Sequence, residues 1–450
     1  MRRTIFLLCV LWPTTVGAQG RQSPLNQRPR AVSINAEFLR LASLTALWPG
    51  YRPEGIPLAV FTGDHTYLFR HPSPPPEFTT VDGVASMPGR HPAVTANSSA
   101  TIGGIGTATL LADGVRGALP VTDQAAVALH EAFHVFQRTV HSSWAGNEGD
   151  LFTYPVERPD LLRLRREESE YLRRALAAAA SAKRCLTRMA MMRRAERFTA
   201  MDAAHVAYER NSEMNEGLAT YVQLRAVAKR SVEIPMGDFP TTAVRRRVYA
   251  TGPALAFLLD AARPGWREEL ERNDSLRLDP MLAQAVADAP GRCDLPAGVT
   301  ARMARTATAD VRRLAAERIS ARLAFDRLAG WRLVIEPAIG APLWPQGFDP
   351  LNIAQVAGGT LHHRMLKLGN DSLSISMVDG EGVDFEALTE AAGAHPLFNG
   401  IRRAEFVLPS QPMITREGSV VTISAPGLQG RFAGMEVVEA PNRVVVRIRR

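Results

Sequence analysis

The order of apolar and polar residues divides the chain into stretches of different character. Up to about residue 115, short apolar runs alternate with turn residues and predict strands at Ile56–Phe61, Thr66–Phe69, Ala93–Ala96 and Thr107–Leu111. The Gly63-Asp64 pair between the first two runs favours a hairpin, and the glycines of residues 103–106 favour a turn. We therefore expect a small N-terminal sheet, preceded by a flexible leader over residues 19–35 and a short helix over Ala36–Ala46.

Helical spacing of apolar residues replaces the alternation between about residues 116 and 329. The runs Leu161–Ala182 and Leu186–Lys229 predict a helical hairpin, inserted over residues 158–210. Arginine and glutamate are dense between residues 163 and 174, and we expect them to form a solvated helix face with i,i+4 pairs.

Strand alternation returns after Gly330. The expected strands there are Arg332–Ile335, Ser372–Met377, Glu405–Leu408, Ser419–Ile423 and Arg443–Ile448. The fold class predicted for the whole chain is α+β. Its expected parts are residues 19–115 with the sheet, a helical body over 116–329, and a small β-rich C-terminal domain over 330–450.

Two histidines stand four residues apart in the helical run Val127–Arg138. They are His130 and His134, and Glu131 follows the first directly. Residues i and i+4 of an α-helix share one face, so both imidazoles can reach one cation while Glu131 is rotated to the side. This His-Glu-x-x-His pattern is a signature of zinc metalloproteases, and it predicts one Zn²⁺ per chain.

A zinc ion with two imidazole ligands and one carboxylate ligand keeps a fourth position for water, and it lowers the pKa of that water to about 7. Glu131 is the expected general base, which takes a proton from this water and later gives it to the leaving amine. A third protein ligand is still required. Glu209, Glu213 and Glu216 recur at helical spacing and share one face, so each of them is a candidate.

The segment Asn-Glu-Gly-Leu-Ala-Thr-Tyr at residues 215–221 distinguishes among these glutamates. Together with the histidine pair, it resembles the gluzincin metallopeptidases, whose aminopeptidase-like branch carries such a segment on a second helix. The resemblance implies a zincin-like catalytic domain with Glu216 as third zinc ligand. For Glu209 and Glu213 we favour hydrogen bonds or ion pairs with nearby arginines. Tyr-x-x-Gly at 249–252 also matches this branch, and implies that Tyr249 donates a hydrogen bond to the oxyanion.

The resemblance covers about residues 120 to 270 and has two departures. His134 and Glu216 lie 82 positions apart, whereas the corresponding residues of the aminopeptidase branch are much closer, and the inserted hairpin accounts for the difference. No Gly-x-Met-Glu-Asn segment for binding a free amine is present. Exopeptidase and endopeptidase action therefore both stay open. His141, seven residues after His134, could extend the metal face, but we favour a surface position near a helix end.

The first residues carry two arginines, a short apolar run and small residues ending at Ala18. This pattern predicts a signal peptide over residues 1–18, cleaved after Ala18, and a periplasmic or secreted protein. Cys185 and Cys293 remain after cleavage, so in an oxidising compartment they form either a disulfide or two buried thiols. No later segment reaches 18 unbroken apolar residues, so we expect no transmembrane segment.

The net charge of +8 comes almost entirely from arginine, because lysine occurs only at positions 183, 229 and 367. In an exported protein we attribute this bias to genome composition and expect no nucleic-acid partner. The predicted function is a zinc-dependent peptidase acting on a peptide or protein substrate. Two alternatives stay open: an envelope binding or scaffold protein with a structural or vestigial zinc site, and a zinc hydrolase of a non-peptide amide. The oligomeric state is not predicted.

Overall fold

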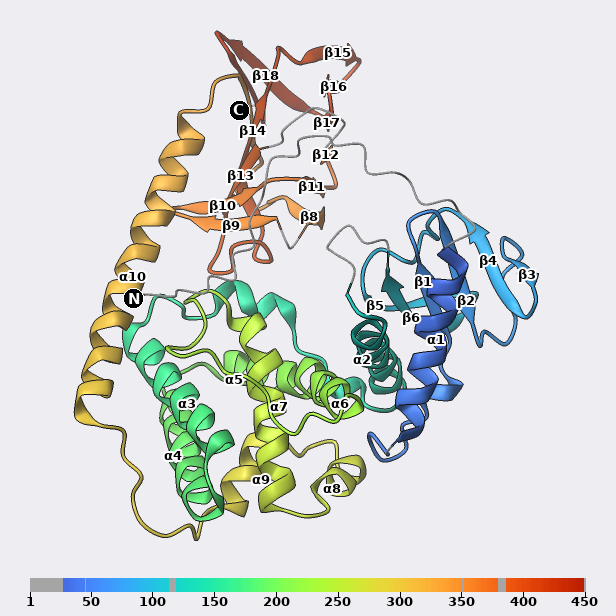
Figure 1. Ribbon diagram of the computed structural model, residues 1–450. Coiled ribbons are helices and arrows are strands. Elements are labelled where there is room, and N and C mark those ends of the chain that lie inside the picture. Colours follow the sequence, from blue (N-terminus) through green and yellow to red (C-terminus); the bar gives the residue numbers. More distant parts are fainter. Residues whose placement is uncertain (1–26, 45, 113–118, 350–351, 379–385, 449–450) are drawn as a thin grey trace, which may run out of the picture. The chain divides into compact units, whose positions relative to one another are not determined.

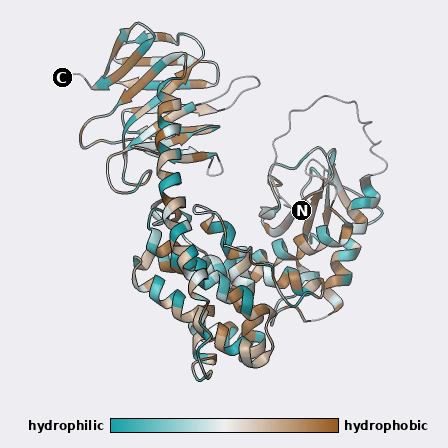
Figure 2. Ribbon diagram, turned by 60° about the vertical axis from the view of Figure 1, so that its left-hand side comes forward, coloured by the Kyte–Doolittle hydropathy of each residue, from teal (hydrophilic) through white to brown (hydrophobic). Residues whose placement is uncertain are grey.

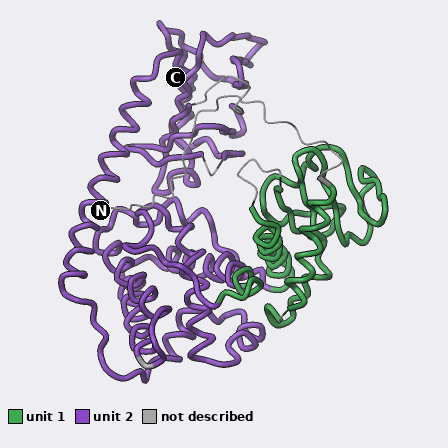
Figure 3. The backbone as a smooth tube through the Cα atoms, viewed as in Figure 1, with its two compact units in different colours: residues 1–140, 222–229 green, residues 141–221, 230–450 purple. Residues whose placement is uncertain are grey.

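The computed structural model describes residues 27–44, 46–112, 119–349, 352–378 and 386–448, and Figure 1 shows their helices and strands. The chain is mixed α and β, with a helical body and a β-rich C-terminal region, which confirms the predicted α+β class. It divides into two compact units, residues 1–140 with 222–229 and residues 141–221 with 230–450 (Figure 3). The predicted signal peptide, residues 1–18, lies outside the described residues, and the predicted domain boundaries at 115 and 329 remain predictions.

The first unit contains a six-stranded sheet with strand order β3-β4-β2-β1-β6-β5. Its strands are β1 (Leu58–Phe61), β2 (His65–Phe69), β3 (Thr79–Val81), β4 (Val84–Pro88), β5 (Ser98–Ile102) and β6 (Ile105–Leu111). The predicted β1–β2 hairpin is present and antiparallel, while β1 and β6 pair in parallel. The glycine-rich stretch forms the turn between β5 and β6, with Gly103 and Gly104 at positive φ, as predicted.

The predicted strand over Ala93–Ala96 is wrong, because these residues lie in turns and the strand begins at Ser98. The amide of Val94 donates to the carbonyl of His91 at 2.9 Å and closes a turn. Val94 is nevertheless fully buried in the core beside the sheet. The short apolar run therefore supplies a core side chain without forming a strand.

Helix α1 (Gln27–Leu44) begins earlier than predicted, and the expected flexible leader is wrong for residues 27–35. Ala31, Ile34, Phe38 and Leu41 are all buried, at 0 to 2% exposure. Their spacing follows one helix face. Arg28, Pro29 and Arg30, which precede this stripe, conceal the start of the helix in the sequence, but the buried face holds the helix.

Helix α2 (Val121–Val140) carries the histidine pair and packs against this sheet. The hydroxyl of Tyr51 donates to the carbonyl of Leu129 at 3.0 Å, and Arg138 donates to the carbonyl of Ser99 on β5 at 2.7 Å. A Cβ at Gly106 would lie 3.0 Å from Cγ1 of Val135. The absence of a side chain at Gly106 thus lets strand β6 approach the helix closely.

The helical body begins with α3 (Pro159–Ala177) and α4 (Ala180–Thr199), which form a hairpin and lie side by side in Figure 1. The following elements are α5 (Ala203–Ser212), the π-helical turn η5 (Glu213–Gly217), α6 (Leu218–Ala226), α7 (Val244–Ala262), α8 (Trp266–Arg272), α9 (Leu278–Ala285) and α10 (Ala297–Asp326). The 3₁₀ turns are η2 (Pro53–Gly55), η3 (Ser142–Trp144) and η4 (Glu148–Thr153). A disulfide joins Cys185 and Cys293, whose Cα atoms are 6.0 Å apart. None of the helices in the described ranges has the length and apolar character needed to cross a bilayer.

The expectation of a solvated charged face between residues 163 and 174 is wrong for much of that stretch. Glu168 is fully buried, and Arg165, Arg166, Glu167 and Glu170 are each at most 7% exposed. Glu168 accepts hydrogen bonds from arginines of α4 and α7, which are distant in sequence. The helical period alone could not reveal these partners, and without them a charged residue is expected in water.

The β-rich region contains two sheets, ordered β18-β19-β7-β14-β13-β10-β9 and β15-β16-β17-β12-β11-β8. The strands are β7 (Trp331–Glu336), β8 (Trp344–Phe348), β9 (Ile353–Val356), β10 (Gly359–His362), β11 (Met365–Asn370), β12 (Leu373–Val378), β13 (Glu386–Ala391), β14 (Ile401–Leu408), β15 (Met413–Glu417), β16 (Val420–Ala425), β17 (Leu428–Ala433), β18 (Met435–Ala440) and β19 (Arg443–Ile448). All five predicted strands are present. Residues of both sheets share one apolar core, and hydrophobic and hydrophilic residues are interleaved along the strands (Figure 2).

Candidate metal centre

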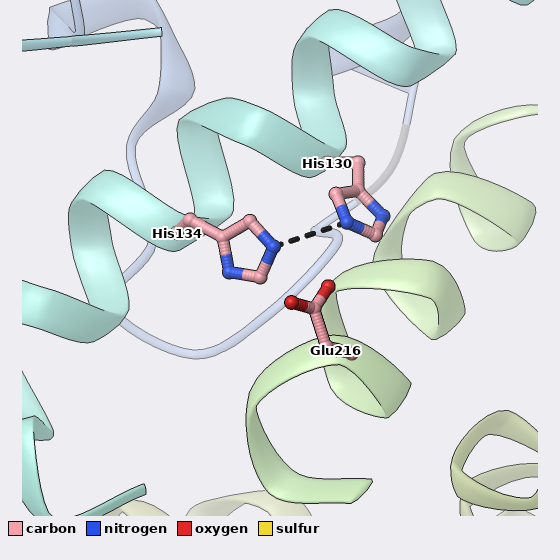
Figure 4. Close-up of side chains that lie close together, drawn as sticks. All are labelled: His130, His134 and Glu216. Atoms are coloured by element: carbon pink, nitrogen blue, oxygen red, sulfur yellow. Dashed lines mark hydrogen bonds between the residues drawn. The ribbon is translucent and has the colours of Figure 1, made fainter. Parts of the chain in front are cut away.

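The two histidines of α2 project from the same side of the helix, as their spacing predicts. Their Nε2 atoms lie 3.1 Å apart, and their rings meet edge to face (Figure 4). Nitrogen ligands at about 2.0–2.1 Å from a tetrahedral zinc would lie roughly 3.3 Å from each other. The observed separation of the Nε2 atoms of His130 and His134 therefore suits a shared cation.

Gln137, one turn further along α2, orients His134. Its side-chain oxygen lies 2.8 Å from Nδ1 of His134, and Gln137 is only 2% exposed. An amide oxygen only accepts hydrogen bonds, so this contact favours the tautomer in which Nδ1 carries the proton and Nε2 keeps its lone pair. This is the tautomer that a metal ligand needs. The sequence analysis missed Gln137, although its i+3 spacing from His134 was available as a signal.

Glu131, the predicted general base, is buried on α2 at 7% exposure, next to His130 at 6%. Both residues lie in the apolar middle of the helix, where Ala128, Leu129 and Ala132 are completely buried. A carboxylate in such surroundings has little contact with bulk water.

Glu216 lies in η5, where the backbone widens for one turn into a π-helix between α5 and α6. It is 8% exposed. One of its carboxylate oxygens accepts a hydrogen bond from Arg245 at 2.9 Å. Single π-turns inside helices occur frequently at functional sites, because they redirect one side chain out of the regular helical pattern.

His130, His134 and Glu216 form a buried group whose ligand atoms all lie within 4.8 Å of one another (Figure 4). The group offers two imidazole nitrogens and one carboxylate oxygen, a donor set that can hold a metal ion. Within the described part of the chain, it is the one group of three or more histidine, cysteine, aspartate or glutamate side chains that could hold a metal ion. The structure thus brings together the three residues that the sequence analysis named as ligands.

Glu213 and Glu209 engage arginines, which confirms the preferred interpretation of these two glutamates. Glu213 accepts from Arg194 at 2.6 and 2.7 Å and from Thr251 at 2.6 Å. Glu209 forms an ion pair with Arg197. These bonds use the carboxylate oxygens of both residues and fix the helix up to the start of the π-turn.

Three arginines of α4 and α7 surround Glu168 beneath this turn. They are Arg194, Arg197 and Arg247, and each is at most 2% exposed. Burial alone would raise the pKa of Glu168, but the three guanidinium groups hold that pKa well below its usual range. Burial likewise opposes ionisation of Glu209, and its arginine neighbours lower its pKa to about 2. The network is therefore charged at neutral pH and clamps α3, α4, α5 and α7 together.

Tyr249, the predicted oxyanion donor, lies on α7 one turn after Arg245. Arg245 donates to the hydroxyl of Tyr249 at 3.4 Å as well as to Glu216. Burial alone would lower the pKa of Arg245, but its anionic and phenolic neighbours outweigh burial and raise the pKa. One guanidinium thus links the predicted ligand and the predicted oxyanion donor. The sequence did not single out Arg245, because it is the first of three consecutive arginines.

The expectation that His141 lies at the surface is wrong. It is 3% exposed and stacks on Trp144, with ring centroids 3.8 Å apart. Its Nδ1 lies 2.5 Å from Asp274 and its Nε2 lies 3.0 Å from Glu271. Partners more than a hundred residues away therefore bury a histidine that follows directly after the end of α2.

Comparison of the chain with protein-family models, with curated proteins and with solved structures finds no match. The residues of the centre supply two nitrogen ligands, one oxygen ligand, a neighbouring buried carboxylate, a phenol and an arginine.

Proposed function

We propose that the chain is an exported zinc peptidase of the gluzincin type, with His130, His134 and Glu216 as the ligands of one Zn²⁺. The observation that carries this proposal is the buried group of these three side chains, with ligand atoms within 4.8 Å of one another. Two imidazoles and one carboxylate are the ligand set of catalytic rather than structural zinc sites, which leave a coordination position open.

When bound, the zinc ion would polarise the scissile carbonyl and acidify a water molecule. Glu131 follows a ligand directly in sequence, and its carboxylate is the group that accepts the proton of the attacking water and delivers it to the departing amide nitrogen. The hydroxyl of Tyr249 donates a hydrogen bond to the carbonyl oxygen as negative charge develops there. Loss of one such donor typically slows turnover by about 10²–10³-fold.

Two features of the fold support this assignment. Helix α2 packs on the β5–β6 side of the first unit's sheet, and β5 is an edge strand of that sheet. An edge strand can pair with the extended backbone of a peptide substrate. The Cys185–Cys293 disulfide suits an oxidising compartment, which agrees with export to the periplasm or the cell exterior.

The test combines metal analysis with a peptide library. The mature protein is purified, its zinc content is measured, and its cleavage of a mixed peptide library is followed by mass spectrometry. Glu131→Gln is expected to bind one zinc per chain but to cleave nothing, because an amide cannot accept the proton. Glu317→Gln, which changes an exposed glutamate of α10, serves as the matched control and is expected to cleave like the wild type.

The outcomes separate the competing functions. Zinc-dependent cleavage by the wild type alone supports the peptidase and shows from the cut positions whether it acts as an exopeptidase or an endopeptidase. Zinc binding without peptide cleavage would direct attention to a non-peptide amide or to a structural metal site. A protein that binds no zinc would refute the proposal.

A further inference from the structure

Arg245, on α7, contacts both the predicted oxyanion donor Tyr249 and the predicted metal ligand Glu216. Its Nε donates to Glu148 at 3.1 Å, one terminal nitrogen donates to Tyr249 at 3.4 Å, and the other donates to Glu216 at 2.9 Å. A guanidinium has five N–H groups in a planar fork. The three contacts found among the described residues use three of these five N–H groups.

The side chain of Arg245 is also open to solvent. It is 43% exposed. Arg247, two residues further along α7, is by contrast 2% exposed and donates hydrogen bonds to Glu168 and Ser169. Arg247 is thus committed to the buried network. Arg245 has one side held by the site and the other accessible to a ligand.

Glu148 is an exposed partner of Arg245 that also accepts a hydrogen bond from the hydroxyl of Tyr208 at 3.4 Å. It lies at the start of the short turn η4, and its side chain is 55% exposed. An ion pair between exposed side chains at such a position contributes little to stability. A carboxylate that arrives with a ligand can therefore replace Glu148 on Arg245 at small cost.

We propose that Arg245 is the specificity-determining residue of the site and binds a carboxylate of the substrate, so that the preferred substrates are peptides with a carboxylate close to the scissile bond. The inference rests on the proposed function, because it assigns a substrate class to the same centre. The contact with Glu216 holds the guanidinium beside the predicted metal ligand. The planar fork of a guanidinium matches the two oxygens of a carboxylate, so its remaining N–H groups can donate to a carboxylate of a bound ligand. The carboxylate can be the peptide C-terminus or an acidic side chain.

The experiment measures binding rather than turnover, using zinc-loaded Glu131→Gln as the parent protein. Three acetylated pentaalanine probes are titrated by calorimetry: one with a free C-terminal carboxylate, one with a C-terminal amide, and one amidated with a single alanine replaced by glutamate. We expect one or both carboxylate probes to bind roughly ten-fold more tightly than the neutral amide at low salt. The comparison between the two carboxylate probes identifies which source the site accepts.

Arg245→Gln in the same parent is expected to abolish the preference for carboxylate, whereas Arg246→Gln, an exposed neighbour with the same charge change, is expected to keep it. Arg245→Lys retains the charge without the fork and is expected to keep part of the preference. Zinc content is measured for every variant. If Arg245 only positions Glu216, zinc affinity falls in Arg245→Gln while the carboxylate preference survives, and that result overturns the proposal.

The proposal is also overturned if the parent protein shows no preference for the carboxylate probes, or if none of the three probes binds. These results are distinguishable from failure of the proposed function. A parent that prefers carboxylates, with a wild type that hydrolyses no peptide, would leave Arg245 as a ligand-binding residue of a site that is not a peptidase. A wild type that cleaves neutral and carboxylate peptides equally well would keep the peptidase and reject the role of Arg245.

Discussion

Gly217 and Gly252 touch backbone to backbone. A Cβ on Gly217 would lie 2.6 Å from Cα of Gly252, and a Cβ on Gly252 would lie 2.5 Å from Cα of Gly217. Gly217 follows Glu216 in η5, and Gly252 lies three residues after Tyr249 in α7. The contact therefore sets the distance between the element with the predicted ligand and the element with the predicted oxyanion donor.

Alanine at either glycine is expected to push η5 and α7 apart. Overpacking of a rigid backbone contact costs typically about 1–3 kcal/mol, so Gly217→Ala and Gly252→Ala should each lower the free energy of unfolding by that amount and weaken zinc binding. Urea unfolding and zinc titration measure the two effects. Gly298→Ala, at an open position of α10, is the control and should leave both quantities unchanged or slightly raise stability. Unaltered zinc affinity in both variants would show that the contact does not position the ligand.

Gln137→Ala is expected to lower zinc affinity by about 10–100-fold, which is the usual effect of removing the partner that orients a histidine ligand. The hydrogen bond to Nδ1 of His134 is lost, so the ring is free to rotate and to change tautomer. Competition with a chromophoric chelator gives the affinity. Thr139→Ala, at an exposed position of the same helix, provides the control. An affinity equal to that of the wild type would remove Gln137 from the site.

Glu216→Ala and Glu213→Gln are expected to fail in different ways. The first removes a predicted ligand and should abolish tight zinc binding while the protein stays folded. The second leaves Arg194 without part of its buried partner and should cost about 3–5 kcal/mol of stability. Zinc content and urea unfolding, measured for both variants, show whether each one loses zinc binding or stability. Full zinc content in Glu216→Ala would move the third ligand to another residue.

The local part of the centre could be predicted from the sequence because a helix fixes its own geometry. His130 and His134 share a face whatever surrounds them, and hairpin β1–β2 follows from its apolar runs and turn residues. Glu216 required the resemblance of its segment to a known family, since spacing alone allowed Glu209 and Glu213 equally. The structure then separates the three glutamates by their partners, because Glu209 and Glu213 bond to buried arginines.

The errors at Glu168 and His141 share one physical cause, which is that the decisive partner is distant in the chain. Glu168 is buried because Arg194 and Arg247 reach it from other helices, and His141 is buried because Asp274 and Glu271 cover it. Helical or strand periodicity says which residues share a face, but it does not say what that face meets. Arg245 was missed for the same reason, since its meaning lies in its contacts with Glu148 and Glu216.

Stability is expected to fall at acidic pH through the buried carboxylates. The folded-state pKa of Glu209 is about 2, below its ordinary value of 4.5, so the unfolded state binds the proton first as the pH falls. The stability that ionised Glu209 contributes is present above pH 4.5 and is lost between pH 4.5 and about 2. The difference between the two pKa values corresponds to about 3 kcal/mol of unfolding free energy. Glu168 acts in the same direction. Urea unfolding at pH 7 and pH 3 measures the loss, and Glu209→Gln should be less stable at pH 7 but show a shallower decline. An equally steep decline in that variant would assign the acid sensitivity to other groups.

The disulfide gives a prediction that is independent of the metal. Cys185 and Cys293 are separated by 108 residues, and closing a loop of this length in the unfolded chain stabilises the folded state by up to about 4–5 kcal/mol, with 2–4 kcal/mol typical. Cys293→Ser should lower the free energy of unfolding by that amount, and a thiol reductant should do the same to the wild type. The variant itself should not respond to the reductant, which makes it the control. Because neither cysteine belongs to the group of His130, His134 and Glu216, zinc content should stay at one per chain throughout. Loss of zinc on reduction would instead show that the α3–α4 hairpin must be tied to the segment before α10 for the centre to form.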